Sequence, residues 1–377
     1  MAEAPAQLRG LQWTILVLTL LGIAASVAGA IVDLPAVSRA YLVAVVTWFA
    51  FPLGALAMLV AWHLTGGYWG YVIGGALEAM VRTLPLLALL FLPALAGLDA
   101  IYPWTHPEFL EAHDLVARKA GYLNAPFFIL RSLLYLGIWT GLAWLMTAPS
   151  RRFDQHRRRR GPATIAAMLY ALTASFASID WIMSLQPTFH SSAFGMLVMS
   201  GQGVGGYALA LLLALGLVEA AGRADLVRDH RKVGLGNLFV GLVLLWTYFA
   251  FMQYLVIWSG DRPHGAEWYI DRGEGVWLWF IAITAFANGG LPFFVLLSSR
   301  ARQNWWVLMA LAVLVILARV LETLWMCIPA FGVLAPAAWM IAATMIAVGG
   351  VWLSAVLWLL LPRTAWIVRA VEVAGRG

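Results

Sequence analysis

A few charged side chains lie inside long apolar stretches of this sequence, where they could move protons. A charge buried in a bilayer costs about 2.5–3.5 kcal/mol on the insertion scale, so such residues usually face a partner, water or a working site. Carboxylates in these surroundings are candidates for accepting and releasing protons. The charged set is Glu78, Arg82, Arg131, Asp180, Arg319 and Glu322. Their polar companions are His63, Gln253 and Asn288.

Four of these residues form two local pairs. Glu78 and Arg82 are four residues apart, and Arg319 and Glu322 are three apart. Both spacings bring two side chains onto one face of a helix. Each pair therefore has two interpretations. It neutralises itself and removes its own insertion penalty, or it faces a hydrated cavity or a proton path.

Asp180 lies near the end of an apolar stretch, in "SFASIDWIMSLQP" (175–187). As a structural group it would bond exposed backbone or interfacial water, and as a functional group it would carry protons. The segment "DWIMSLQP" is partly repeated at 322–329 as "ETLWMCIP", where Glu322 takes the place of the aspartate. This repetition favours the functional interpretation. Arg131 has no acid within four residues, so its partner must come from another helix, and Asp180 or Glu322 is at a suitable depth.

The elements that position these residues are membrane-spanning helices. The chain has 377 residues, of which 63% are hydrophobic and 11% charged, whereas soluble domains have about 25% charged residues. Crossing a bilayer takes about 20 apolar residues in a helix. Ten stretches meet this requirement and leave no room for a soluble domain. They are 11–32, 41–64, 70–97, 123–147, 162–184, 193–218, 234–258, 276–298, 305–328 and 337–361.

The basic residues predict how these helices are oriented. With the N-terminus in the cytoplasm, 16 of the 24 Lys and Arg residues lie on the cytoplasmic side, and six of those 16 lie within 151–160. Five lie on the outer side and three within spans. Such an asymmetry is typical of multi-pass proteins with cytoplasmic basic loops. It predicts that both termini are cytoplasmic, and it makes anionic lipid, not nucleic acid, the partner of the positive charge.

Several classes of site are excluded by the motifs. The single cysteine, Cys327, permits neither an internal disulfide nor an iron–sulfur cluster, which needs about four thiolates. His63 is the only histidine well inside a span, so no bis-histidine haem site is expected. "GQGVGG" (201–206) fits a nucleotide-binding pattern but lies inside an apolar span, where close helix packing is the better interpretation. The stretch 11–32 is too long for a signal peptide and is interpreted as a retained helix.

Three segments resemble one protein family. They are "SFASIDWIMSLQPTFHSSAFG" (175–195), "LWTYFAFMQYLVIWSGDRPHGAEWY" (245–269), and "RTLPLLALLFLP" (82–93) with the following "YPW" (102–104). They are similar to polysulfide-reductase-like membrane subunits, specifically the F-type subunit of alternative complex III, a bacterial quinol:cytochrome c oxidoreductase. The resemblance extends over about 41–361. It implies two four-helix bundles with two peripheral helices.

The resemblance also implies a location and partners. The expected location is a bacterial inner membrane. The expected partners are a related quinol-binding polytopic subunit, an iron–sulfur subunit and c-type cytochromes. Iron–sulfur clusters and haem c would belong to those partners, and menaquinone or ubiquinone would be the quinone, while this chain would bind no cofactor itself. Its expected role is to conduct protons or to line space that a quinone can reach. A secondary transporter and a purely structural scaffold are the alternatives.

The predicted site residues divide between the two halves of the membrane. Glu78 and Arg82 would serve the cytoplasmic half, and His63 accompanies them as the one histidine within a span. Four residues would serve the outer half, where protons leave an oxidised quinol: Arg131, Asp180, Arg319 and Glu322.

Overall fold

The computed structural model describes residues 6–147, 160–223, 232–260 and 263–361. Most of the arginine-rich segment 151–160 lies outside these ranges, as do Arg228, Arg231 and the basic residues after 361. Helices and short turns make up the described residues, and no strand occurs among them. Ten helices, several of them broken, are long and apolar enough to cross a membrane. The chain is therefore an all-α, multi-pass membrane protein, as the sequence predicts.

The helices that make up the ten spans follow one another along the chain. Their bounds are α1 (Ala6–Val32), α2 (Leu34–Thr65), α3 (Tyr68–Val81), α4 (Leu84–Ala96), α8 (Ala125–Thr147), α9 (Arg160–Trp181), α10 (Phe194–Ala220), α11 (Lys232–Gly260), α13 (Gly275–Thr284), α14 (Leu291–Leu297), α16 (Trp305–Cys327) and α17 (Ala338–Leu360). Shorter helices lie mostly between them: α5 (Leu98–Ile101), α6 (Pro107–Ala112), α7 (Asp114–Ala117), α12 (Pro263–Gly273) and α15 (Ser299–Gln303).

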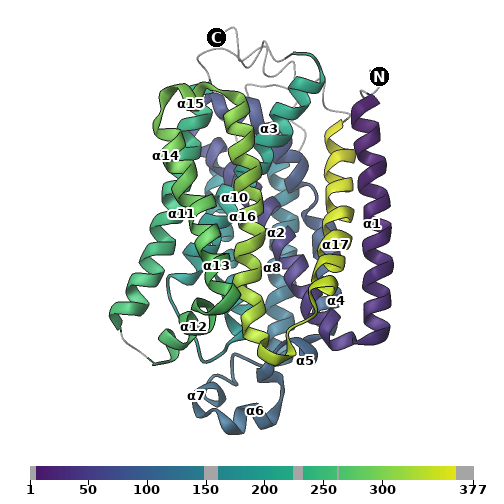
Figure 1. The fold of residues 1–377 in the computed structure, drawn as a ribbon, viewed down its shortest axis with the longest axis vertical. Helices are drawn as coiled ribbons and strands as arrows, with labels where there is room; N and C mark the ends of the chain where they lie inside the picture. The colour runs from purple at the N-terminus through teal and green to yellow at the C-terminus, as the bar shows by residue number, and fades with distance from the viewer. Residues whose placement is uncertain (1–5, 148–159, 224–231, 261–262, 362–377) are drawn as a thin grey trace.

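The long helices form two groups of four spans with two further helices at one edge. The first group contains α2, the broken helix α3–α4, α8 and α9, and the second contains α10, α11, the broken helix α13–α14 and α16. Helices α1 and α17 pack side by side at the edge of the molecule, at the right in Figure 1. Helices α6, α7 and α12 all lie at the lower end in Figure 1, which is called the α12 end below.

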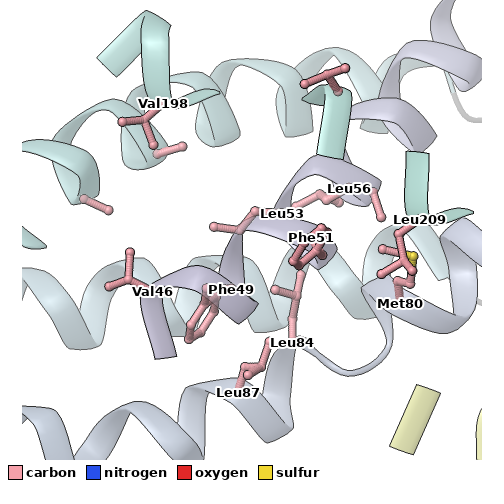
Figure 2. Packing of buried hydrophobic residues seen from close by; sticks show 14 of the residues in the cluster. Val46, Phe49, Phe51, Leu53, Leu56, Met80, Leu84, Leu87, Val198 and Leu209 are labelled. Carbon is pink, nitrogen blue, oxygen red and sulfur yellow. The ribbon is translucent and has the colours of Figure 1, made fainter. Parts of the chain in front are cut away.

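Helix α2 is the centre of the structure because apolar residues surround it on nearly all sides. In Figure 2, Phe49, Phe51 and Leu53 of α2 lie among side chains from the neighbouring helices. Helix α2 also begins at Leu34, seven residues before the predicted start at 41. The reason is local: the Asp33 side chain caps the helix by accepting the backbone N–H of Ala36 at 3.0 Å.

Glycines allow α2 and α10 to cross at very short range. A Cβ atom built on Gly54 of α2 would overlap the backbone of Gln202 and crowd that of Gly206 on α10. A Cβ on Gly206 would in turn overlap the backbone of Gly54. The interpretation of the segment 201–206 as a helix-packing motif is therefore confirmed. This contact joins the two four-helix groups through their backbones.

Two of the spans are interrupted at polar residues. The third span breaks between α3 and α4, at Arg82 and Thr83, because Pro85 lies in the first turn of α4 and cannot donate a backbone hydrogen bond. The eighth span contains a π-helical turn at Ala285–Gly290, which includes Asn288. Turns of this kind are rare and are frequently found at functional sites.

Candidate functional site: two buried arginine–carboxylate pairs

Arg131 of α8 and Asp180 of α9 form the first buried ion pair. Nε of Arg131 donates to Oδ2 of Asp180 at 2.8 Å, and Nη2 donates to Oδ1 at 3.0 Å. The contact is bidentate, which is the strongest arrangement for this pair of groups. The carboxylate has no exposed surface. Of the two partners that the sequence allows for Arg131, the structure selects Asp180.

Aromatic side chains enclose this pair. The hydroxyl of Tyr135, one turn after Arg131 on α8, donates to Oδ2 of Asp180 at 2.8 Å. The ring of Tyr122 lies 3.8 Å from the guanidinium carbon, and Arg131 also donates to the Tyr122 carbonyl oxygen at 2.9 Å. The Trp181 indole N–H donates to Ser132 and fixes the last turn of α9. The pair is thus satisfied by α8, α9 and the segment that precedes α8.

The second ion pair joins Arg319 and Glu322 on α16. The two side chains contact each other directly, as their spacing predicts. The indole N–H of Trp246 on α11 donates to Oε1 of Glu322 at 3.1 Å. Both charged side chains are buried, with 6% of Arg319 and 2% of Glu322 exposed. As at Asp180, an arginine and an aromatic donor hold a buried carboxylate.

Glycines of α10 make room for the second pair. A Cβ atom on Gly201 would overlap the Arg319 guanidinium, and one on Gly205 would lie 3.1 Å from the Arg319 Cγ atom. The segment 201–206 therefore has two uses, since it allows the contact with α2 and also accommodates Arg319. Periodicity alone gives no sign of this second use.

A small cavity lies where the two groups of helices meet. Its volume is about 30 Å³, which is enough for a water molecule. Polar residues from both groups line it, among them Ser178, Gln202, Arg319 and Thr323. Gln202 also accepts a hydrogen bond from the Tyr170 hydroxyl at 2.8 Å. Arg319 thus lies between its own carboxylate and a small, mostly apolar cavity that reaches the first group.

The pair of Glu78 and Arg82 lies apart from the other two pairs. The nearest nitrogen–oxygen distance is 3.9 Å, and about a quarter of each side chain is exposed. Arg82 also donates to the carbonyl oxygen of Thr147, the last residue of α8, at 2.6 Å. This contact places the pair toward the end of the molecule opposite α12. His63 is buried in the last turn of α2 with its ring stacked on Trp62, and it belongs to neither of the two buried ion pairs.

Arg272 is a buried cation that sequence reasoning did not select. It lies on α12 and donates to Gln186 Oε1 and to the carbonyl oxygens of Trp268 and Met326, at 2.9–3.0 Å. Burial lowers the pKa of its guanidinium to about 10. Helix α12 lies in the segment between α11 and α13. In the structure, Arg272 anchors this segment to the chain itself.

Tyr135 and Trp246 were also missed as site residues. The i,i+4 spacing of Arg131 and Tyr135 could have indicated a shared target, because such residues lie on one helix face. Trp246 lies in the segment 245–269, which carries the family resemblance, but no charge or spacing there distinguishes it from the other tryptophans as a hydrogen-bond donor.

Within the described residues, no group of three or more His, Cys, Asp or Glu side chains could hold a metal ion. No protein-family model matches the chain, and no curated protein matches it. The resemblance to alternative complex III subunits therefore stays a prediction from the sequence segments that carry it.

Proposed function

We propose that the chain is a membrane subunit of a quinol:electron-acceptor oxidoreductase, the acceptor being a cytochrome c, and that its buried carboxylates conduct protons. The observation that supports this most is the matched pair of carboxylates. Asp180 ends a span of the first group and Glu322 lies near the end of a span of the second. Each is buried, contacts an arginine and accepts a hydrogen bond from an aromatic side chain.

A buried ion pair contributes little to the free energy of folding, but its carboxylate can take part in proton transfer. The desolvation of two buried charges often exceeds their attraction, and apolar residues of similar volume frequently stabilise a protein as well or better. Two such pairs therefore stabilise the fold less than apolar residues in their places would. When a proton neutralises Asp180 or Glu322, the attraction to its arginine is lost, and the arginine becomes free to move. Each pair thus provides a proton acceptor together with a group that responds to protonation.

The other polar residues suggest the course of a path. The Glu78–Arg82 pair would take up protons at the end opposite α12, since it is partly exposed. The small cavity near Gln202 and Arg319 lies between the two helix groups. Under this proposal, protons are exchanged with the α12 end through Asp180 and Glu322, where a quinol bound to the partner subunit would also release protons. The basic loops predict the α12 end to be the outer side, and the family resemblance implies that the membrane is a bacterial inner membrane.

Purification of the tagged chain from its own membranes tests the proposal. We expect the chain, extracted in mild detergent, to co-purify with a second polytopic subunit and an iron–sulfur protein. The reduced-minus-oxidised visible spectrum of this preparation should show c-type haem. Cross-linking before extraction guards against loss of subunits in the detergent. A colourless chain that captures no redox protein even after cross-linking would contradict the proposal and favour a transporter.

A further inference from the structure

The interior of the second helix group contains buried polar atoms that have no protein partner. Five such atoms have no hydrogen-bond partner among the described residues: Gln253 Nε2, Thr284 Oγ1, Asn288 Nδ2, Asn288 Oδ1 and Arg319 Nε. Gln253, Thr284 and Asn288 have no exposed surface. Leaving a buried donor or acceptor unsatisfied costs about 1–3 kcal/mol. Five of them on neighbouring helices indicate that something else supplies the hydrogen bonds.

These atoms come from three spans, and the π-helical turn of the eighth span packs against both α11 and α16. Thr284 and Asn288 are four residues apart at the junction of α13 and the π-helical turn, so they lie on similar faces. Gln253 lies seven residues, or about two turns, after Trp246 on α11, which brings both to one face. Arg319 belongs to α16. Figure 1 shows α13 between α11 and α16 in this view.

Trp246 of α11 lies beside both α16 and the π-helical turn. Its indole N–H donates to Glu322 of α16. On another side, its ring would lie 3.4 Å from a Cβ atom at Gly289, the residue after Asn288. The π-helical turn, Trp246 and the Arg319–Glu322 pair are therefore neighbours. This polar seam is defined here by Gln253, Thr284, Asn288, Arg319 and Glu322.

The chemistry of the seam selects water as its ligand. The amide groups of Gln253 and Asn288 and the guanidinium of Arg319 offer donors, Asn288 Oδ1 is an acceptor, and the Thr284 hydroxyl can do either. A metal cation would be repelled by Arg319, and an anion by Glu322. Water donates and accepts at once, and buried water typically makes about three bonds to such groups.

We infer that ordered water molecules occupy the polar seam between α11, α13 and α16 and hydrogen-bond to Asn288, Thr284, Gln253 and Arg319. Toward the α12 end the seam reaches Ser191, which precedes α10 and donates to Gln253 Oε1 at 2.7 Å. Water in this position connects Glu322 with the α12 end of the molecule. That this water carries protons rests on the proposed function, whereas its presence does not.

X-ray hydroxyl-radical footprinting of the full-length chain in its native membranes tests this inference. Radicals form from the bound water itself, so a buried side chain beside water is oxidised, and one in a dry core is not. Trp246 is 3% exposed and Trp352 is fully buried. Trp352 is the control, because it lies outside the seam and its indole N–H, like that of Trp246, has a protein partner, the Thr83 hydroxyl, at 2.7 Å. We expect Trp246 to be oxidised several-fold faster than Trp352.

Substitutions within the seam test whether the water that causes the oxidation of Trp246 lies there. Thr284→Val and Asn288→Leu remove hydrogen-bonding groups and should reduce the oxidation of Trp246 several-fold. Thr284→Val changes the shape of the side chain little, so its effect does not arise from misfolding. Thr247→Val is the matched control, because this hydroxyl donates to Val243 within its own helix. Equal oxidation of Trp246 and Trp352, or oxidation of Trp246 that Thr284→Val leaves unchanged, would overturn the inference. The readout needs no turnover, so it stands or fails separately from the proposed function.

Discussion

Replacement of Asp180 by alanine is expected to destabilise the folded chain by about 3–5 kcal/mol, the range found when one partner of a buried ion pair is removed. The change leaves the Arg131 guanidinium buried beside Tyr122 and Tyr135 without a counter-charge. Unfolding in mixed micelles, by titration with a denaturing detergent and detection of tryptophan fluorescence, measures the difference. Glu111→Ala removes an exposed carboxylate on α6 and should change the stability little. If Asp180→Ala and Glu111→Ala unfolded at similar detergent concentrations, Arg131 and Asp180 would not form the buried ion pair described above.

A double substitution shows that the cost arises from the unpaired charge. Arg131→Leu combined with Asp180→Leu should recover much of the stability that either change alone removes, because an apolar pair leaves no charge buried. The expected result is strong non-additivity, as is typical of residues in direct contact. If the effects of the two changes simply add, the two side chains do not act as a pair.

A methyl group at Gly54 is expected to weaken the structure by about 3 kcal/mol or more, near the upper limit of ordinary overpacking. The added Cβ atom would overlap the backbone of Gln202, and backbone cannot rotate away as a flexible side chain can. The crossing of α2 and α10 would have to open, although it joins the two helix groups. The same detergent titration measures the change in stability.

Gly203→Ala is the matched control for this contact. It lies on α10 within the same glycine-rich segment, and a Cβ atom there meets nothing within 4 Å. Alanine is favoured over glycine inside a helix by about 0.5–1 kcal/mol, so this variant should be neutral or slightly more stable. Destabilisation by Gly203→Ala comparable to that by Gly54→Ala would show that the glycines act through something other than the α2–α10 contact.

Most of the helical architecture could be predicted because membrane spans have a simple requirement. An apolar stretch long enough to cross the bilayer must satisfy its backbone internally, and a helix does so. The early start of α2 could also have been predicted, since Asp33 and Pro35 form a usual helix start. Pro85 could likewise have predicted the break in the third span at Arg82.

The candidate site was only partly predictable because its partners come from distant parts of the chain. The lack of a nearby acid showed that Arg131 must reach another helix, but depth alone could not distinguish Asp180 from Glu322. Trp246 is 76 residues from Glu322, and nothing local links them. Asn288 was noted as a polar residue in a span. The π-helical turn that contains Asn288 depends on packing between helices, which the periodicity of the sequence does not reveal.

The most direct test of the account is the number of protons moved per electron by the intact complex in sealed vesicles, with Asp180→Asn and with Glu322→Gln. Each substitution keeps the shape of the side chain and removes its ability to carry a proton. We expect both variants to assemble, because the amide oxygen can still accept a hydrogen bond from the arginine. The rate of proton movement should fall by roughly 10²-fold, the lower end of the effect of removing a positioned acid–base group, so that fewer protons move per electron. Glu111→Gln, at an exposed position, should behave as the unmodified chain. Assembled complexes with unchanged turnover and an unchanged proton-to-electron ratio in both buried variants would contradict the account and leave these carboxylates a structural role.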